Sequence, residues 1–278
     1  MLSLHIKNIA GLFLTSLFLL TAVTVWAETV EYDGLIGPSI VVEIGAPAEG
    51  IVSKVTVDRG SLVKHGQTLV ELESTVEQAT SEKYQAMATF NGEIGLQQAH
   101  LAFAKRAHER IKQIEAFSTH DKDQAATEIV MTEYRLKKAL ENRTLAELEF
   151  KKAQAELARR SIKSPISGVV VERYLSPGEY VNNKPLLRVA QINPLRVEVI
   201  VPAEMFGRIN PGMTATIVPD MQKFGARTAT VTIVDKVIDS ASNTFGVRLD
   251  LANADLQVPS GLKCLVKFAL NDNTAEVK

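Results

Sequence analysis

The sequence predicts a protein of mixed α and β structure, elongated and divided into several domains. Three observations support this fold class: a short β-type motif occurs twice, a long proline-free helical pattern separates the two copies, and alternating strand patterns fill the C-terminal third. Together they predict a small β-sandwich split by an inserted antiparallel coiled-coil α-hairpin, followed by a small antiparallel β-barrel.

The repeated motif lies at residues 46–63, APAEGIVSKVTVDRGSLV, and again at residues 164–181, SPISGVVVERYLSPGEYV. Runs of Val, Ile and Thr interrupted by glycine are typical of short strands joined by tight turns. We therefore expect residues 44–73 and 161–191 to form two halves of one sandwich. An offset of 118 positions superimposes Pro47 on Pro165, Gly50 on Gly168, Val52 on Val170, Gly60 on Gly178 and Val63 on Val181. The four glycines among these pairs are expected in turns.

Residues 74–160 are predicted to form the helical hairpin. No proline occurs from Ser74 to Phe117, and a spacing of three and four residues marks the seam of a coiled coil. The first seam is Met87, Phe90, Ile94, Gln97, Leu101, Ala104, His108 and Ile111. The second is Leu136, Ala139, Arg143, Ala146, Phe150, Ala153 and Leu157. The polar segment STHDKD, residues 118–123, is the expected linker, and helices of this length form a stalk of roughly 60 Å.

Arg143 interrupts the second seam. Its guanidinium group either points outward or pairs across the hairpin. A sharper interpretation is that it sets the register of the two helices.

Residues 192–272 alternate apolar and polar side chains between recurrent turn signals, as expected for a small barrel. Residues 28–43 are expected to supply a strand that joins this barrel. Cys264 is the single cysteine, so no intramolecular disulfide can form, and its place in LKCLVKF predicts a buried structural side chain. Residues 273–278 are expected to form a short tail.

The N-terminal residues 1–27 have the organisation of a secretory signal peptide. Lys7 precedes a long apolar run, and the small residue Ala27 lies just before Glu28. We expect cleavage after Ala27 and a mature protein outside the cytoplasm. An uncleaved membrane anchor is the alternative, because the apolar run approaches the ~20 residues that span a bilayer.

This order of segments resembles the periplasmic adaptor proteins, also called membrane fusion proteins, of Gram-negative tripartite efflux and secretion systems. The resemblance is carried by APAEGIVSKVTVDRGSLVKHGQTLVELE, by IKSPISGVVVERYLSPGEYV and by the barrel segments PLRVEVIVPAE and GMTATIVPD. It implies that the repeated halves form a split lipoyl-like domain. It also implies an adaptor that links an inner-membrane transporter to an outer-membrane channel resembling TolC, in a ring commonly of six copies.

The barrel sequence is most similar to adaptors of the proton-driven resistance-nodulation-division pumps. An adaptor of an ATP-driven exporter or secretion system is the alternative. After Leu270 only NDNTAEVK follows, so the membrane-proximal domain of many such adaptors is expected to be absent or vestigial. At the hairpin tip, Arg110, Ile114 and Ser118 are similar to the residues with which family members contact their channels.

Other functional classes receive less support from the sequence. A formal charge of −1 gives no general attraction to nucleic acid. The sequence contains no recognisable set of nucleophile and base, no phosphate-binding glycine loop and no paired-carboxylate motif, so an enzyme is not predicted. His100 and His108 have no partner four residues away and the methionines are not clustered, so neither a metal site nor a cofactor is expected. Two rivals stay open: a periplasmic scaffold without a channel, and, least favoured, a lipoyl or biotinyl carrier domain.

Overall fold

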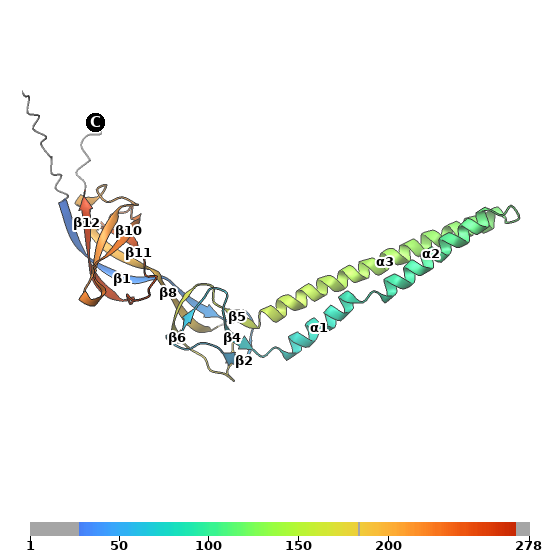
Figure 1. Cartoon of the computed structure of the whole chain (residues 1–278), viewed down its shortest axis with the longest axis horizontal. Coiled ribbons are helices and arrows are strands. Elements are labelled where there is room, and N and C mark those ends of the chain that lie inside the picture. Colours follow the sequence, from blue (N-terminus) through green and yellow to red (C-terminus); the bar gives the residue numbers. More distant parts are fainter. Residues whose placement is uncertain (1–27, 183, 271–278) are drawn as a thin grey trace, which may run out of the picture.

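The computed structural model describes residues 28–182 and 184–270. The barrel, the sandwich and the hairpin follow one another along the long axis of the molecule (Figure 1). The mixed architecture predicted from the sequence, with its helical hairpin and small barrel, is therefore confirmed. The predicted signal peptide, residues 1–27, and the predicted tail, residues 273–278, lie outside the described residues.

The barrel is a closed antiparallel sheet. Its strands follow the order β1-β12-β9-β10-β11-β8, and β8 pairs with β1 to close it. The strands are β1 (Glu28–Gly45), β8 (Pro185–Pro202), β9 (Thr214–Pro219), β10 (Arg227–Val234), β11 (Thr244–Leu251) and β12 (Leu262–Leu270), with two 3₁₀ turns at Ala203–Met205 and Gln222–Phe224. Closure leaves no free sheet edge among the described strands of the barrel.

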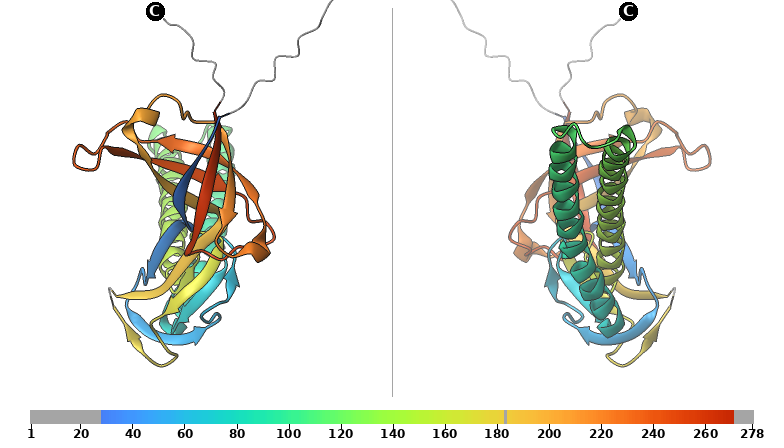
Figure 2. Two further views of the ribbon diagram at one scale, coloured as in Figure 1. Left: turned by 90° about the vertical axis from the view of Figure 1, so that its left-hand side faces the viewer. Right: turned by 90° about the vertical axis from the view of Figure 1, so that its right-hand side faces the viewer.

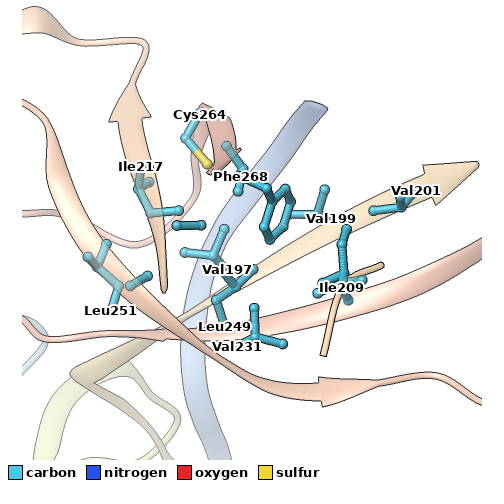
Figure 3. Close-up of a cluster of buried hydrophobic side chains, with 14 of the residues drawn as sticks. Val197, Val199, Val201, Ile209, Ile217, Val231, Leu249, Leu251, Cys264 and Phe268 are labelled. Carbon is cyan, nitrogen blue, oxygen red and sulfur yellow. The ribbon is translucent and has the colours of Figure 1, made fainter. Parts of the chain in front are cut away.

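Alternate side chains of these strands fill the barrel, as the period of two requires. Phe268, Val197 and Leu249 are fully buried at its centre (Figure 3). Cys264 is 2% exposed in the same cluster, which confirms the prediction of a buried structural cysteine.

The sandwich continues directly from the barrel, because β1 and β8 run through both domains (Figure 1). One of its sheets has the order β5-β4-β2-β7, and the other consists of β3 and β6 beside the sandwich portions of β8 and β1. The added strands are β2 (Gly50–Val55), β3 (Leu62–Val63), β4 (Thr68–Leu72), β5 (Ser161–Lys163), β6 (Gly168–Arg173) and β7 (Tyr180–Val181).

The two copies of the repeated motif interlock reciprocally. The amide of Val52 donates to the carbonyl of Glu179 at 2.9 Å, and the amide of Gly178 donates to the carbonyl of Val52 at 2.8 Å. At the equivalent positions, Val170 donates to Ser61 at 2.9 Å and Gly60 donates to Val170 at 2.8 Å. Both valines are 1% exposed and belong to one core. The copies are thus halves of a single domain with approximate two-fold symmetry.

The four motif glycines have two different roles. Gly60 and Gly178 lie in turns with φ of 86° and 90°, where a side chain would be strained. Gly50 and Gly168 were expected in turns as well, but they lie in strands β2 and β6. Close packing explains the second pair, because a Cβ atom on Gly168 would lie 2.1 Å from the carbonyl oxygen of Ala190.

The hairpin contains three helices, α1 (Thr75–Thr89), α2 (Gly92–Lys112) and α3 (Thr119–Ala158). A single first helix was expected, but Phe90 is extended, with φ −73° and ψ 119°, and separates α1 from α2. Phe90 and Asn91, the two residues between the helices, shift the seam of α1, so Ala88 is buried whereas Met87 and Phe90 are 51% and 72% exposed. Those two seam residues were therefore assigned wrongly. From Ile94 to Ile111 the predicted seam does face α3.

Helix α3 forms the second arm of the hairpin. It has the predicted seam but starts earlier than expected. Ala139 and Ala153 are buried on it, and Arg143 pairs across the hairpin with Asn91, as one of the two interpretations held. The expected linker at residues 118–123 is wrong, because helix α3 already begins at Thr119. Within residues 28–182 and 184–270, no helix has the length and apolar character needed to cross a membrane.

Candidate functional site

The hairpin tip is the part of the molecule farthest from the barrel (Figure 1). Helices α2 and α3 run side by side up to it, and residues 113–118 connect them (Figure 2). All three of the residues expected to contact a channel, Arg110, Ile114 and Ser118, lie in or next to this connection.

Ser118 has a structural role at the tip. Its hydroxyl accepts a hydrogen bond from the amide of Asp121 at 3.2 Å, and its own amide donates to the Asp121 carboxylate at 3.0 Å. This reciprocal pair is a capping box, which satisfies otherwise unpaired amides at the start of α3. It explains why the turn ends at Ser118 and not at residue 123.

The same contacts shift the ionisation of Asp121. Hydrogen bonds from the Ser118 hydroxyl and amide hold the pKa of the Asp121 carboxyl below its usual value. The negative charge also lies at the helix N-terminus, where the helix dipole favours it. The capping box therefore fixes the conformation of the connection where it joins α3.

Arg110 and Ile114 are free to contact another molecule. Arg110 lies in the last turn of α2, is exposed, and has no hydrogen bond or ion pair within the described part of the chain. Ile114 is 47% exposed in the connection, and Phe117 beside it is 40% exposed. The tip thus presents an unpaired cation next to two apolar side chains.

Below the tip, a groove of about 510 Å³ opens between α2 and α3. It was not foreseen from the sequence. Its apolar lining includes Phe103, Ala107, Ile111 and Phe117, and Phe103 is 59% exposed. Ala104 and Ala107 are the small side chains of α2 in its lining, and no pattern in the sequence indicates how far apart the two helices lie there.

The base of the hairpin is fixed to the sandwich. Arg160 forms an ion pair with Glu77 of α1 and donates from Nη1 to the carbonyl oxygen of Glu49 at 2.7 Å. Both charged side chains are mostly buried, at 22% and 19% exposed. Because such a partly desolvated pair links three segments, it sets the direction in which the stalk leaves the domain.

The histidines considered as metal ligands are dispersed. His100 lines the tip groove, and His108 is half-buried next to Glu109. Among residues 28–182 and 184–270, no three His, Cys, Asp or Glu side chains are grouped closely enough to hold a metal ion.

Comparison with known proteins places this arrangement in a family. The model of the CzcB-like, barrel-sandwich hybrid domain matches residues 40–191, more than half of the 278 residues. The pyoverdine export membrane fusion protein PvdR of Pseudomonas aeruginosa is 27% identical over 197 residues, covering 68% of this chain and 50% of PvdR. The cation efflux system protein CzcB of an Alcaligenes species is 23% identical over 215 residues, covering 77% of this chain and 39% of CzcB.

Among solved structures, MacA from Actinobacillus actinomycetemcomitans is similar with a TM-score of 0.72 and 21% identity. The match covers 88% of this chain and 79% of MacA, and at this identity it concerns the fold. The chain spans about half or less of the length of the two curated relatives above, 50% and 39%.

Proposed function

The chain belongs to the membrane fusion proteins with a CzcB-like barrel-sandwich hybrid domain, and on this basis we propose that it is a periplasmic adaptor of a tripartite efflux system. It links an inner-membrane transporter to an outer-membrane channel resembling TolC. It has no catalytic role, and the transporter selects the exported compound.

The stalk is the observation that carries this proposal. Helix α3 has 40 residues and is therefore about 60 Å long, and it projects from the sandwich on the side opposite the barrel. Arg160 fixes the base of this rod. Because the rod is already ordered, it can span a gap without a loss of conformational entropy when the complex assembles. Its tip offers Arg110, Ile114 and Ser118 to the helices of a channel.

The other end of the molecule is proposed to face the inner membrane. The barrel contacts the transporter, for which a proton-driven pump is favoured on the barrel sequence. The sandwich domains of several copies, commonly six, form a ring around the conduit.

Co-purification tests the central claim. The tagged full chain is crosslinked in intact cells, and the membranes are solubilised and purified. Recovery of an inner-membrane transporter is expected, and its sequence distinguishes a proton-driven pump from an ATP-driven exporter. Repeated recovery of the chain without any transporter contradicts the adaptor function.

Docking at the tip needs a separate experiment. Ile114→Cys and Ser118→Cys are expected to crosslink to an outer-membrane protein, while Ser53→Cys, exposed on the sandwich, serves as the matched control. The Ile114 variant leaves the capping box intact, so it reports contact even if Ser118→Cys disturbs the turn. A folded Ile114→Cys protein that recovers a transporter but never a channel argues for a scaffold.

A further inference from the structure

The groove between α2 and α3 has the size and the lining of a small-molecule site. The two helices run side by side up to the tip (Figure 2), and the groove between them measures about 510 Å³. Ligand pockets in proteins typically measure about 300–1,000 Å³, with mostly apolar and aromatic linings and a few polar groups. The groove can therefore hold an organic molecule. We call it the tip groove.

One stripe of each helix lines the tip groove. The α2 stripe is His100, Phe103, Ala104, Ala107 and Ile111. The α3 stripe is Asp121, Gln124, Ala125, Glu128 and Thr132. Side chains spaced in this way share one face of a helix, so each helix contributes a continuous wall. The α2 wall is mainly apolar, whereas the α3 wall carries the carboxylates.

Two exposed phenyl rings belong to the lining. Phe103 of α2 is 59% exposed, and Phe117 of the connection is 40% exposed. Exposed rings grouped around a groove indicate a contact surface. The face of an aromatic ring also attracts an organic cation. The rings therefore suit an apolar ligand, and they bind it more strongly if it is positively charged.

The charge of the lining is negative. Asp121 and Glu128 are its carboxylates, and none of the described residues that line the groove is Lys or Arg. His100 is the remaining titratable side chain. Hydrogen bonds from Ser118 hold the pKa of the Asp121 carboxyl below its usual value, so this group is ionised at neutral pH. The groove thus combines apolar rings with acidic groups.

Each carboxylate keeps one oxygen available. Asp121 accepts through Oδ2 from the amide and the hydroxyl of Ser118, at 3.0 and 2.6 Å. Glu128 accepts through Oε1 from Arg135 at 3.1 Å and from the Thr132 hydroxyl at 3.3 Å. Within the described part of the chain, nothing donates to Asp121 Oδ1 or to Glu128 Oε2. Arg135 offsets part of the Glu128 charge, but both carboxylates are oriented and can meet a ligand.

We propose that the tip groove binds a hydrophobic organic cation, such as a quaternary ammonium or phosphonium compound. The apolar part of the ligand lies against Phe103, Ala107 and Ile111, and its cationic centre lies near Asp121 and Glu128. Apolar contact supplies affinity, and the carboxylates discriminate against an anion of the same shape. The inference goes beyond the proposed adaptor function and does not depend on it.

A pair of ions with the same shape and opposite charge tests the ligand class. Tetraphenylphosphonium and tetraphenylborate are titrated calorimetrically into the purified full chain in detergent, and the heats of titration into detergent alone are subtracted. The phosphonium is expected to bind at least about tenfold more tightly than the borate. A smaller preference, a preference for the borate or no binding overturns the proposal.

Filling the groove tests the location. Ala107→Leu is expected to weaken binding of the phosphonium at least about tenfold, because the larger side chain occupies the space of the ligand. Ala102→Leu, at an exposed position of α2 outside the lining, is the matched control and should bind like the parent protein. Unchanged binding by a folded Ala107→Leu protein, or an equal loss in Ala102→Leu, overturns the proposal.

The charge of the α3 wall is tested separately, in a variant that leaves the groove open. Glu128→Gln is expected to weaken phosphonium binding about threefold and not to weaken borate binding. Glu133→Gln removes an exposed carboxylate that pairs with Lys105 outside the lining, and it should change neither affinity. Equal effects of the two substitutions on phosphonium binding contradict the proposal, even if Ala107→Leu fails to fold.

A single cysteine in the groove distinguishes a small ligand from a macromolecule. In Ala107→Cys, the phosphonium is expected to protect the thiol from a small maleimide, and a short thiol crosslinker in intact cells should give no protein adduct. An adduct with an outer-membrane protein or with a second copy of the chain shows that a protein covers the groove, and it overturns the proposal. A transporter recovered by co-purification leaves the adaptor function standing in either case.

Discussion

The guanidinium of Arg143 donates a hydrogen bond of 3.0 Å from Nη1 to the side-chain oxygen of Asn91, where the break between α1 and α2 ends. Its Nε donates to Glu147 at 3.0 Å, which orients the group. The polar residue in the seam of α3 thus meets the interruption in the opposite helix. This contact links the two helical arms of the hairpin, and we predict that it sets their register.

Removing this contact is expected to loosen the break. Arg143→Ala should lower the free energy of unfolding by about 0.5 to 1 kcal/mol, a small value because both groups are partly exposed. Hydrogen exchange should accelerate around Phe90 and Asn91. A cycle with Asn91→Ala measures the coupling, and Arg135→Ala, which removes an arginine that pairs with Glu128, should show no coupling to Asn91. Zero coupling between Arg143 and Asn91 would count against a register role.

The cap at the tip is expected to stabilise the first turn of α3. Ser118→Ala should cost about 1 kcal/mol and speed hydrogen exchange at the start of the helix. Thr119→Ala, at the adjacent exposed position, is the control with little effect. Equal effects of the two substitutions would contradict the importance of the capping box.

The cap also predicts a pH dependence. The pKa of Asp121 is below its usual value because Ser118 donates to the carboxylate, so this stabilisation is present above the usual pKa and is lost as the pH falls through the lowered one. In Ser118→Ala the pKa of Asp121 should rise towards the usual value. Titration of the carboxyl group by NMR measures the change, and an unchanged pKa would falsify the assignment of the cause.

Gly168 should be the least replaceable of the motif glycines. A Cβ atom there would lie 2.1 Å from backbone oxygen of Ala190, and backbone cannot move aside as a side chain can. Gly168→Ala is expected to cost about 3 kcal/mol or more in chemical denaturation. Gly66→Ala is the control: φ is 78° but no atom lies within 4 Å, so about 1 kcal/mol is expected. A larger loss of stability for Gly66→Ala than for Gly168→Ala would show that the backbone around Gly168 and Ala190 moves to accommodate the added methyl group.

Cys264 should be chemically silent in the folded protein. Burial raises the pKa of its thiol from 9.0 to about 11, with a further contribution from Asp220. Because the folded pKa is the higher one, this contribution to stability is complete below pH 9 and is lost as the pH rises towards 11. Labelling with a thiol reagent at pH 8 should follow the rate of unfolding. Fast labelling under native conditions would contradict burial and complicate the crosslinking experiments.

Local patterns in the sequence were sufficient for much of the fold. The repeat predicted that its two copies form one sandwich, and Val52 and Val170 do share its core. The strand alternation around Cys264 predicted the burial of that side chain. Both inferences depend on which side chains are buried, and the spacing of apolar residues along the sequence indicates this.

The sequence did not predict where individual helices break or begin, because a shift of one or a few residues changes which side chains face the partner helix. The break at Phe90 moved the seam of α1, although the following Asn91-Gly92 pair is a recognised turn signal. The linker was misplaced because Ser118 was read as a loop residue and not as a cap. The tip groove could not be foreseen, since it depends on how closely α2 and α3 approach at Ala104 and Ala107.

The path of β1 has a consequence for the order of folding. Glu28 pairs with Leu270, so the first and last described residues of the barrel are cross-strand neighbours, and β1 also supplies one edge of the sandwich. Such non-local pairing is slow to form, and the barrel cannot close before its final strand is available. The hairpin is different, because α1, α2 and α3 contact one another within a continuous stretch. If the chain folds from its N-terminus, the stalk can therefore form first, the sandwich can follow once β8 is available, and only the barrel waits for β12.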